Sequence, residues 1–506
     1  MMKRILCLVL CLGMVLGMLS GCRADSEEAY VPTGDAILME GEEEHKKVQS
    51  DETQELSLAY YPAQTLNPYN CTDYTNRAMF PLLYQSLFTL NRDYEAIPQL
   101  CESYTVSEDL RLYDITLNPR ATFSDGTSVT AEDVQASFWV AQESAYYSGR
   151  FMHVSNMGVS DRGTVLVYLN QPCSNLPLLL DFPIVKASTV WDSEPMGSGP
   201  YIFSGSTGNW FLSRRSTWWC QSDDLLITAG RIPLLEVSTP TEVRDHFEFG
   251  DVGIVCTDPG SDYYVEYRCD YELWDCETGI FLFIGFNRNS SFFQNDVARQ
   301  AVLRGIDRAL LVDKYYQGFA TVAELPASSN SPFYSRTLAQ NYSYDEAEFM
   351  SLMSTAGAAG TSIRLLVNSD DSLRVKVAQE IGRMLNACGL IVTIDAVDAD
   401  AYYDRLLTFD YDLYLGQTKL SPNMDMSPFF SESGSLNICG MLGINEYNLC
   451  LNALENEGNY YPLYQTIMDN ALICPLLFRS YAVYASRGLL TDLAPARDNL
   501  FSYTIE

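Results

Sequence analysis

The sequence predicts an α/β protein of two lobes, one of which carries an α+β subdomain. At 506 residues the chain is longer than one hydrophobic core usually serves, so two or three domains are expected. Apolar strand patterns at 363–367 and 390–396 flank an amphipathic helix from Ser372 to Gly389, and this β-α-β unit implies parallel strands with a right-handed connection. Alternating strands at 112–118 and 163–170 flank a helix instead, which is the pattern of an α+β region.

The first lobe is expected to span residues 56–279 and to contain the α+β subdomain at about 90–186. Its most clearly marked segment is 122–139. Asp125-Gly126 predicts a tight turn, because glycine accepts positive φ without steric cost. Thr130 then begins a helix whose first turn carries two acids, and a helix N-terminus favours such acids.

The second lobe is expected to span residues 280–478. An apolar strand at 280–287 precedes a long helix that runs from Asn295 to Gly318. After the β-α-β unit, a helix around 401–407 and a strand at 411–415 repeat the same arrangement. The second lobe is therefore predicted to be α/β.

The first residues of the chain predict an export signal. Lys3-Arg4 forms a positive n-region, and the apolar run at 5–19 is shorter than the roughly 20 residues that a membrane span needs. The ending Leu19-Ser20-Gly21-Cys22 resembles a bacterial lipobox, which implies cleavage before Cys22 and a diacylglycerol on its sulfur. Residues 1–21 are therefore interpreted as a lipoprotein signal peptide. The alternative is an ordinary secretory signal followed by a chance cysteine.

Residues 22–55 are expected to form a lipidated, disordered, acidic tether. The stretch 24–55 holds eleven acids and two lysines without an apolar period, a composition that cannot support a packed core. The whole chain is also acidic, with a formal net charge of −33. This charge excludes electrostatic attraction to nucleic acid or to anionic lipid.

The cysteine count leaves the redox state open. Of fourteen cysteines, Cys7 and Cys11 lie in the signal and Cys22 is the expected lipid carrier, so eleven remain. An odd number cannot all pair internally. Exported chains usually oxidise their cysteines, whereas an anaerobic source leaves them as buried thiols. Both alternatives stand.

No motif points to catalysis, a metal or a cofactor. The three histidines are His45, His153 and His246, and the H-E-x-x-H, G-x-S-x-G and P-loop motifs do not occur. Gly197-Ser198-Gly199 has the first two glycines of a nucleotide fingerprint but not the third. We expect no catalytic residues, no metal ligands and no cofactor. An exported hydrolase whose triad forms only in space stays an alternative.

Short motifs follow one another in a fixed order along the chain. They are Leu66-Asn67-Pro68, Tyr84-Gln85-Ser86-Leu87-Phe88, Pro98-Gln99-Leu100, Tyr113-Asp114-Ile115-Thr116-Leu117 leading into FSDGTSVTAEDVQASF at 123–138, Thr164-Val165-Leu166, Gly197-Ser198-Gly199-Pro200-Tyr201, Ile284-Gly285-Phe286-Asn287 and Val297-Ala298-Arg299-Gln300-Ala301. The series resembles the extracellular solute-binding protein family 5, the peptide, nickel and oligosaccharide receptors of ABC importers. The resemblance covers nearly the whole chain after about residue 55.

The resemblance implies a two-lobed periplasmic-binding-protein-like fold of class II with a hinge between the lobes. Strand patterns at 476–478 and 481–485 precede the C-terminus. By the resemblance, residues 479–506 return to the first lobe, so the lobes share crossing strands that act as the hinge.

The resemblance also implies a function. The chain is expected to be an extracellular substrate-binding lipoprotein of an ABC importer, held on the outer face of the cell membrane by its lipid anchor. As a monomer it would capture a small solute, a peptide or another compound, and present it unchanged to the permease subunits, with no nucleic-acid partner. The alternative is a surface interaction or sensor protein that reuses the fold without a transporter.

The candidate ligand loop is 416–430, directly after the strand at 411–415. In peptide-binding members, the matching loop carries a Trp and, three residues later, an Asp that holds the peptide's amino terminus. The matching positions here are Thr418 and Ser421, and a Tyr that contacts peptide in such relatives falls at Ala136. The candidate ligand-binding residues are Gln417, Thr418, Lys419, Ser421, Asn423 and Asp425. The alternative for each of them is a solvated loop position.

The stretch from Leu212 to Trp219 also matches the family, whose members tend to carry a charged strand that ends in an aromatic pair. We interpret Trp218 and Trp219 as side chains of this strand that fill the core.

Overall fold

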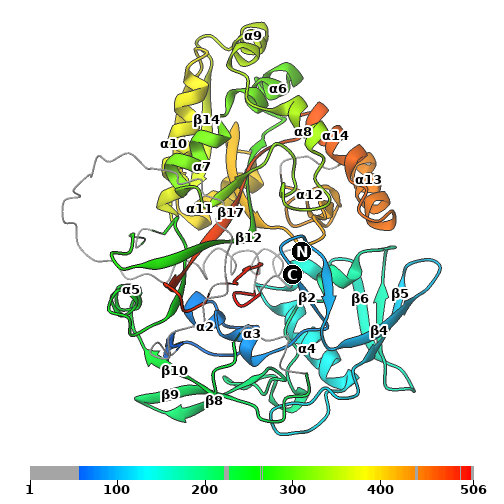
Figure 1. Cartoon of the computed structure of the whole chain (residues 1–506). Helices are drawn as coiled ribbons and strands as arrows, with labels where there is room; N and C mark the ends of the chain where they lie inside the picture. Colours follow the sequence, from blue (N-terminus) through cyan, green and yellow to red (C-terminus); the bar gives the residue numbers. More distant parts are fainter. Residues whose placement is uncertain are drawn as a thin grey trace.

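The computed structural model describes residues 56–220, 227–261, 264, 266–438, 443–490, 492–497 and 499–502. The predicted signal peptide, Cys22 and the acidic tether lie outside these residues. The described chain forms two lobes, one running from blue through cyan to green at the bottom of Figure 1 and one running from green to orange at the top. The long strands β12 (Tyr271–Phe286) and β17 (Ile473–Ser486) run between the lobes (Figure 1).

The first lobe contains a four-stranded sheet in the order β1-β10-β9-β8. Its strands are β1 (Leu58–Tyr60), β8 (Tyr201–Ser206), β9 (Asn209–Arg214) and β10 (Arg231–Glu236). β1 pairs with β10 in parallel, and the other pairs are antiparallel. The smaller elements of this lobe are α2 (Tyr74–Arg77), α3 (Phe80–Leu83), β2 (Phe88–Leu90), β3 (Ala96–Pro98), α5 (Pro240–Glu248) and β11 (Ile254–Thr257).

An antiparallel sheet of order β4-β5-β7-β6 forms the subdomain of the first lobe. Its elements are β4 (Cys101–Val106), β5 (Leu112–Leu117), α4 (Ala131–Glu143), β6 (Val154–Val159) and β7 (Val165–Leu169), with the short 3₁₀ turns Ser148–Phe151, Leu176–Leu179 and Ala187–Thr189. The predicted helix N-terminus is present, because the Asp133 carboxylate accepts from the Thr130 backbone N–H at 2.9 Å. Val134 and Phe138 are buried on the inner face of α4, at the spacing of one helical face.

The second lobe is built on a seven-stranded sheet of order β11-β17-β12-β16-β14-β15, with β13 paired to β17. The remaining strands are β13 (Ala320–Val322), β14 (Ser362–Asn368), β15 (Ile391–Val397) and β16 (Leu413–Lys419). α10 (Ser372–Asn386) joins β14 to β15, which pair in parallel, so the β-α-β unit forms as the sequence predicts. α11 (Ala399–Thr408) leads to β16, which is also parallel to β14.

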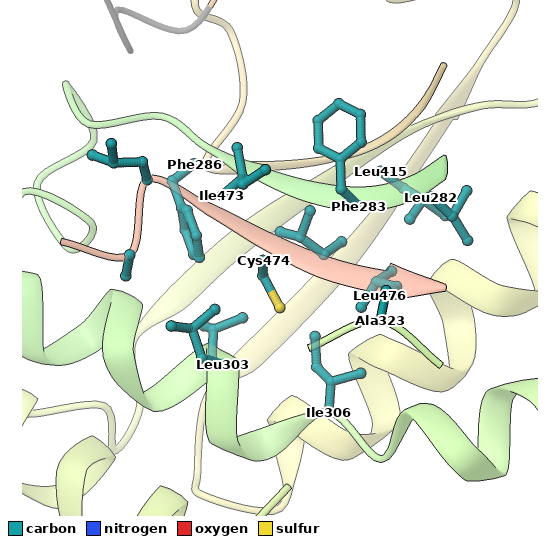
Figure 2. Close-up of a cluster of buried hydrophobic side chains, with 14 of the residues drawn as sticks. Leu282, Phe283, Phe286, Leu303, Ile306, Ala323, Leu415, Ile473, Cys474 and Leu476 are labelled. Atoms are coloured by element: carbon teal, nitrogen blue, oxygen red, sulfur yellow. The ribbon is translucent and has the colours of Figure 1, made fainter. Parts of the chain in front are cut away.

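Helices cover both faces of this sheet (Figure 1). They are α6 (Asp296–Gly305), α7 (Arg308–Tyr316), α8 (Arg336–Ala339), α9 (Glu346–Ala356), α12 (Ser427–Phe430), α13 (Ile444–Glu455) and α14 (Tyr461–Asp469), with a 3₁₀ turn at Gln340–Tyr342. Figure 2 shows part of the core, where Leu303 and Ile306 point toward Cys474 and Leu476 of β17. Each large apolar side chain buried here contributes about 1.5–3 kcal/mol relative to an exposed one.

Three elements differ from the prediction. The expected helix from Asn295 to Gly318 is two helices, because the backbone leaves the helical region at Ile306 and the Asp307 side chain accepts from Leu310 N–H to begin α7. The two strands expected near the C-terminus are one continuous strand, β17. Finally, β16 extends to Lys419, so the candidate residues 417–419 belong to a strand and not to a loop.

The crossing strands belong to the cores of both lobes. β12 contributes Cys276 to the first core and Phe281 to the second, and β17 contributes Val483 to the first and Phe478 to the second. The register of β12 against β17 shifts between Glu277 and Ile280, where Gly279 has φ +74°. The strands therefore bend at the position where they pass from one lobe to the other.

The C-terminal segment after β17 packs on the first core. Leu490, Leu493, Leu500 and Phe501 are buried there. Ten cysteines lie within the described residues, and six of them are buried. Cys439, the remaining one of the expected eleven, lies outside the described residues.

Candidate functional site

A cleft of about 1540 Å³ lies between the two lobes. Residues of α2, α3 and the segment 145–150 line it from the first lobe, and residues of β16 and the following loop line it from the second. The crossing strand β17 and the tail residues 494–502 contribute as well. Pockets for drug-sized ligands usually measure about 300–1,000 Å³, so this cleft has room for a solute of short-peptide size.

Three candidate residues, Gln417, Thr418 and Lys419, line the cleft from the end of β16. They are half-buried, as expected for side chains at the edge of a cavity. Gln417 Oε1 accepts from Arg479 Nη1 at 3.1 Å. Lys419 Nζ lies 3.8 Å from the ring centroid of Tyr146, a first-lobe residue, so this cation–π contact crosses the cleft.

The other three candidates lie in the loop after β16, and only some of them face the cleft. Ser421 lines it and donates to Asn423 Oδ1 at 2.8 Å. Asn423 is buried and not part of the lining, and its Nδ2 donates to Asn175 Oδ1 of the first lobe at 3.1 Å. Asp425 reaches the cleft wall, but its carboxylate is occupied by His153 of the first lobe.

Asp425 and His153 form a buried ion pair between the lobes. His153 Nε2 lies 3.0 Å from Asp425 Oδ2, and Ser427 donates to Asp425 Oδ1 through its backbone N–H at 2.9 Å and its hydroxyl at 2.6 Å. Burial alone would lower the pKa of His153, but the hydrogen bond and charge of Asp425 outweigh it and raise that pKa above its ordinary value of 6.5. Burial would raise the pKa of Asp425, but His153 and Ser427 lower it below 3.8. Asp425 is therefore a poor partner for a ligand ammonium in this conformation.

Arg479 connects both lobes at the crossing strand. Its Nη2 donates to both carboxylate oxygens of Asp258, at 2.7 and 2.8 Å, while its Nη1 donates to Gln417. Burial would lower the pKa of this guanidinium, but the charge of Asp258 holds it above its ordinary value. Arg479 therefore stays charged and fixes the orientation of Gln417 at the cleft wall.

The family is decided by comparison with known proteins. The model described as "Bacterial extracellular solute-binding proteins, family 5 Middle" matches residues 95–437. The chain belongs to this family. Family 5 proteins bind small solutes or peptides and deliver them to ABC permeases, and they are binding proteins, not enzymes.

Two relatives of this chain are glutathione-binding proteins. The glutathione-binding protein GsiB of Escherichia coli (strain K12) is 28% identical over 355 residues, which cover 66% of this chain and 68% of that protein. The glutathione-binding protein GsiB of Salmonella typhi is 27% identical over 354 residues, with the same coverage.

Solved structures show the same fold. HbpA2 from Haemophilus parasuis gives a TM-score of 0.72 at 18% identity and covers 89% of this chain and 100% of its own. NikA from Brucella suis, in complex with Fe(III)-EDTA, gives a TM-score of 0.70 at 18% identity with the same coverage. AppA from Bacillus subtilis, in complex with a nonapeptide, gives 0.61 at 18% identity and covers 89% and 98%. The two-lobed periplasmic-binding-protein-like architecture is thus that of family 5.

Two features of the described residues bear on other classes of site. No group of three or more His, Cys, Asp and Glu side chains in the described part of this family 5 chain is arranged to hold a metal ion. Within the same residues, none of the helices has both the length and the apolar character that crossing a bilayer requires.

Aromatic side chains line the family 5 cleft, and the sequence analysis did not identify them. Trp218 and Trp219 follow β9 instead of ending a strand, and both line the cleft. Trp219 Nε1 donates to Gln85 Oε1 at 2.9 Å. The guanidinium carbon Cζ of Arg77 lies 3.4 Å from the ring centroid of Tyr146. The interpretation of these tryptophans as core residues holds in part for Trp219, which also packs against the first core.

Proposed function

We propose that this family 5 protein captures a peptide-like solute in the cleft and delivers it to the permease subunits of an ABC importer. The observation that carries the proposal is the cleft itself, which both lobes line and which β12 and β17 span as a hinge. The glutathione-binding relatives support a peptide-like solute. A large cavity with aromatic walls and a few polar groups is typical of ligand sites that combine apolar burial with specific orientation.

Within the cleft, we assign solute contacts to Gln417, Thr418, Lys419 and Ser421. Asn423 and Asp425 act indirectly, because they hold the second lobe to Asn175 and His153 of the first lobe and do not contact the solute in this assignment. Ligand binding favours the closed arrangement in this assignment, because the solute contacts both lobes at once only when they approach.

The solute is expected to carry no buried ammonium beside Ser421. A buried ammonium needs a carboxylate partner to offset its desolvation. Ser421 carries no charge, and the Asp425 carboxylate is engaged by His153. Unmodified di- to pentapeptides should therefore bind weakly, whereas peptide-like solutes held by backbone groups, apolar side chains and anionic groups should bind well.

The domain organisation and location follow from the sequence. The lobes are assigned to 56–279 and 280–478, with 479–506 returning to the first lobe. After removal of the signal peptide 1–21, the lipidated Cys22 anchors the protein, as a monomer, to the outer face of the cell membrane through the tether up to residue 55.

Native mass spectrometry of protein purified without denaturation is the test, followed by titration calorimetry with glutathione, blocked tripeptides and unblocked tripeptides. A retained peptide-like solute, or binding of the blocked tripeptides or of glutathione, supports the proposal. Retention of a sugar or metal chelate, together with no heat from any of the peptides, would contradict it.

A further inference from the structure

One buried arginine in the cleft wall, Arg497, has neither a carboxylate partner nor several backbone acceptors among the described residues. The described residues contain eight buried arginines: Arg77, Arg150, Arg215, Arg299, Arg308, Arg374, Arg479 and Arg497. Arg150, Arg374 and Arg479 each pair with a carboxylate. Arg77, Arg215, Arg299 and Arg308 donate to two or more backbone carbonyl oxygens each.

Arg497 differs from all seven. Its Nη2 donates to the carbonyl oxygen of Leu420 at 3.1 Å. Its Nε and Nη1 are buried and have no hydrogen-bond partner in the part of the chain that the structure describes. Arg479 also leaves Nε unpaired, but its other nitrogens bind Asp258 and Gln417.

The Arg497 guanidinium lies where the solute is expected. Arg497 lines the cleft although only 8% of it is exposed. Its partner Leu420 stands between Lys419 and Ser421 in the sequence, and both of these line the cleft. On its other side the guanidinium packs on Gly279, since a Cβ added there would lie 2.6 Å from Nη1.

The acid in this neighbourhood is already engaged. Glu277 is contacted by Tyr94, whose ring centroid lies 5.8 Å from Arg497 Cζ. The same carboxylate accepts from Ser328 Oγ at 2.7 Å and Asn330 Nδ2 at 3.0 Å. Three donors therefore bind Glu277, and none of them is Arg497.

A guanidinium cannot lose its proton to escape this situation, because its pKa exceeds about 12. A buried charge without a partner is costly, so an anionic group from outside the chain is favoured at this position. We propose that Arg497 binds a carboxylate of the solute, an inference that rests on the proposed capture of a peptide-like solute in this cleft. The whole chain is acidic, with a net charge of −33, and attracts no anions at long range, so the preference for an anionic solute arises from basic side chains inside the cleft, Arg497 among them.

The first test compares acids with their uncharged counterparts in calorimetry of the purified protein. The probes are glutathione with its diethyl ester, succinate with succinamide, and inorganic phosphate. We expect glutathione to bind about tenfold or more tightly than its diethyl ester, and succinate about tenfold or more tightly than succinamide. The reason is that a charge-assisted hydrogen bond is lost on esterification or amidation. Arg497→Gln should abolish the difference. Arg162→Gln, the same change at a side chain that is 77% exposed and outside the cleft, should preserve it.

A second test needs no ligand. Arg497→Met removes an unpaired buried cation, so the melting temperature of the unliganded variant should equal or exceed that of the wild type. Arg308→Met is the matched control, because Arg308 is equally buried but donates to Pro475, Leu303 and Ile306 carbonyl oxygens, and its loss should lower the melting temperature. Equal destabilisation by both substitutions would show that Arg497 is satisfied within the chain and would overturn the proposal.

The outcomes separate this inference from the proposed function. Equal binding of glutathione and its diethyl ester overturns the carboxylate site but leaves peptide capture standing. Binding of succinate that depends on Arg497, without binding of glutathione or any peptide, supports the site and removes the peptide assignment. Binding of phosphate alone, or of no acid in preference to its counterpart, overturns the carboxylate assignment.

Discussion

His153 Nε2 lies 3.0 Å from Asp425 Oδ2, and this buried contact joins the two lobes across 272 residues of sequence. Asp425 reaches the cleft wall, but both of its carboxylate oxygens are engaged, because Oδ2 contacts His153 and Oδ1 accepts from Ser427. The contact therefore stabilises the arrangement of the lobes in this structure.

We expect Asp425→Asn to lower the free energy of unfolding by about 2–3 kcal/mol, because it leaves His153 without its anionic partner. The raised pKa of His153 makes the contribution of its charge complete below pH 6.5 and lost as the pH rises through that raised value. The lowered pKa of Asp425 makes its contribution complete above pH 3.8 and lost as the pH falls through the lowered value. Denaturant titrations should thus show the largest difference from wild type at about pH 4–6.5.

The control for that series is Asp161→Asn, at an exposed position of the turn between β6 and β7. It should change stability by less than about 0.5 kcal/mol. A difference between Asp425→Asn and wild type that stays constant up to pH 9 would show that the contact is a neutral hydrogen bond.

Gly279→Ala should reduce both stability and solute affinity. Gly279 has φ +74°, and the added methyl would lie 2.6 Å from Arg497 Nη1, so the guanidinium must move. Gly163→Ala is matched in backbone conformation, at φ +77°, but its methyl meets nothing within 4 Å. Each substitution should lower the free energy of unfolding, measured by denaturation, by about 1 kcal/mol, because alanine is strained at positive φ. In calorimetry, Gly279→Ala should bind the solute more weakly than wild type, whereas Gly163→Ala should not. Equal affinities in the two variants would argue against a role for Arg497.

Tryptophan fluorescence should report solute binding through Trp218 and Trp219. Both line the cleft, whereas Trp191 is 72% exposed at the surface. Trp219→Phe should remove most of the fluorescence change on adding solute and weaken binding about tenfold, since the larger contact area of the indole is lost and Gln85 loses a donor. Trp191→Phe should keep the full change. A signal that survives the double substitution of Trp218 and Trp219 would place the solute elsewhere.

Closure should compact the molecule. Small-angle X-ray scattering should give a smaller radius of gyration with saturating solute than without it, because the solute favours the closed population. Asn423→Ala removes the 3.1 Å bond to Asn175 and should leave the liganded protein less fully closed. An unchanged radius at saturation in the wild type would indicate a rigid site.

Lipidation is expected at Cys22, which lies outside the described residues. Cys22→Ala should abolish labelling of the protein by a radioactive fatty acid and leave the chain uncleaved or released from the membrane. One acyl chain binds membranes only reversibly, so stable anchoring needs the several chains of a bacterial lipoprotein. Cys71→Ala, at a buried position of the folded body, should retain the label. Labelling of the Cys22 variant would contradict the lipobox interpretation.

The fold was predictable where the signal was local. The helix at 372–386 and its two flanking strands follow from apolar periodicity, which neighbouring residues carry by themselves. The family motifs likewise identified the two-lobed architecture. The break at Ile306 was missed because apolar spacing continues through it, and only the cap at Asp307 marks the new helix.

The site was predictable only in part. Gln417, Lys419 and Ser421 line the cleft, and they were named as candidates because the strand at 411–415 was recognisable. The engagement of Asp425 by His153 and the position of Arg497 against Gly279 depend on residues that are more than 200 positions apart, and no pattern in either segment announces the other. Charge and residue type indicate what these side chains can do, but only the folded chain shows which partner each one has.

The two crossing strands make the timing of folding depend on the end of the chain. β17 inserts between β11 and β12, and Leu490, Leu493, Leu500 and Phe501 then cover the first core. Neither core can close until these residues have emerged, although more than four hundred residues precede them. A nascent chain therefore stays without a closed core until nearly all of its residues have been made. This delay suits a polypeptide that must pass end-on through a narrow pore before it acquires its shape.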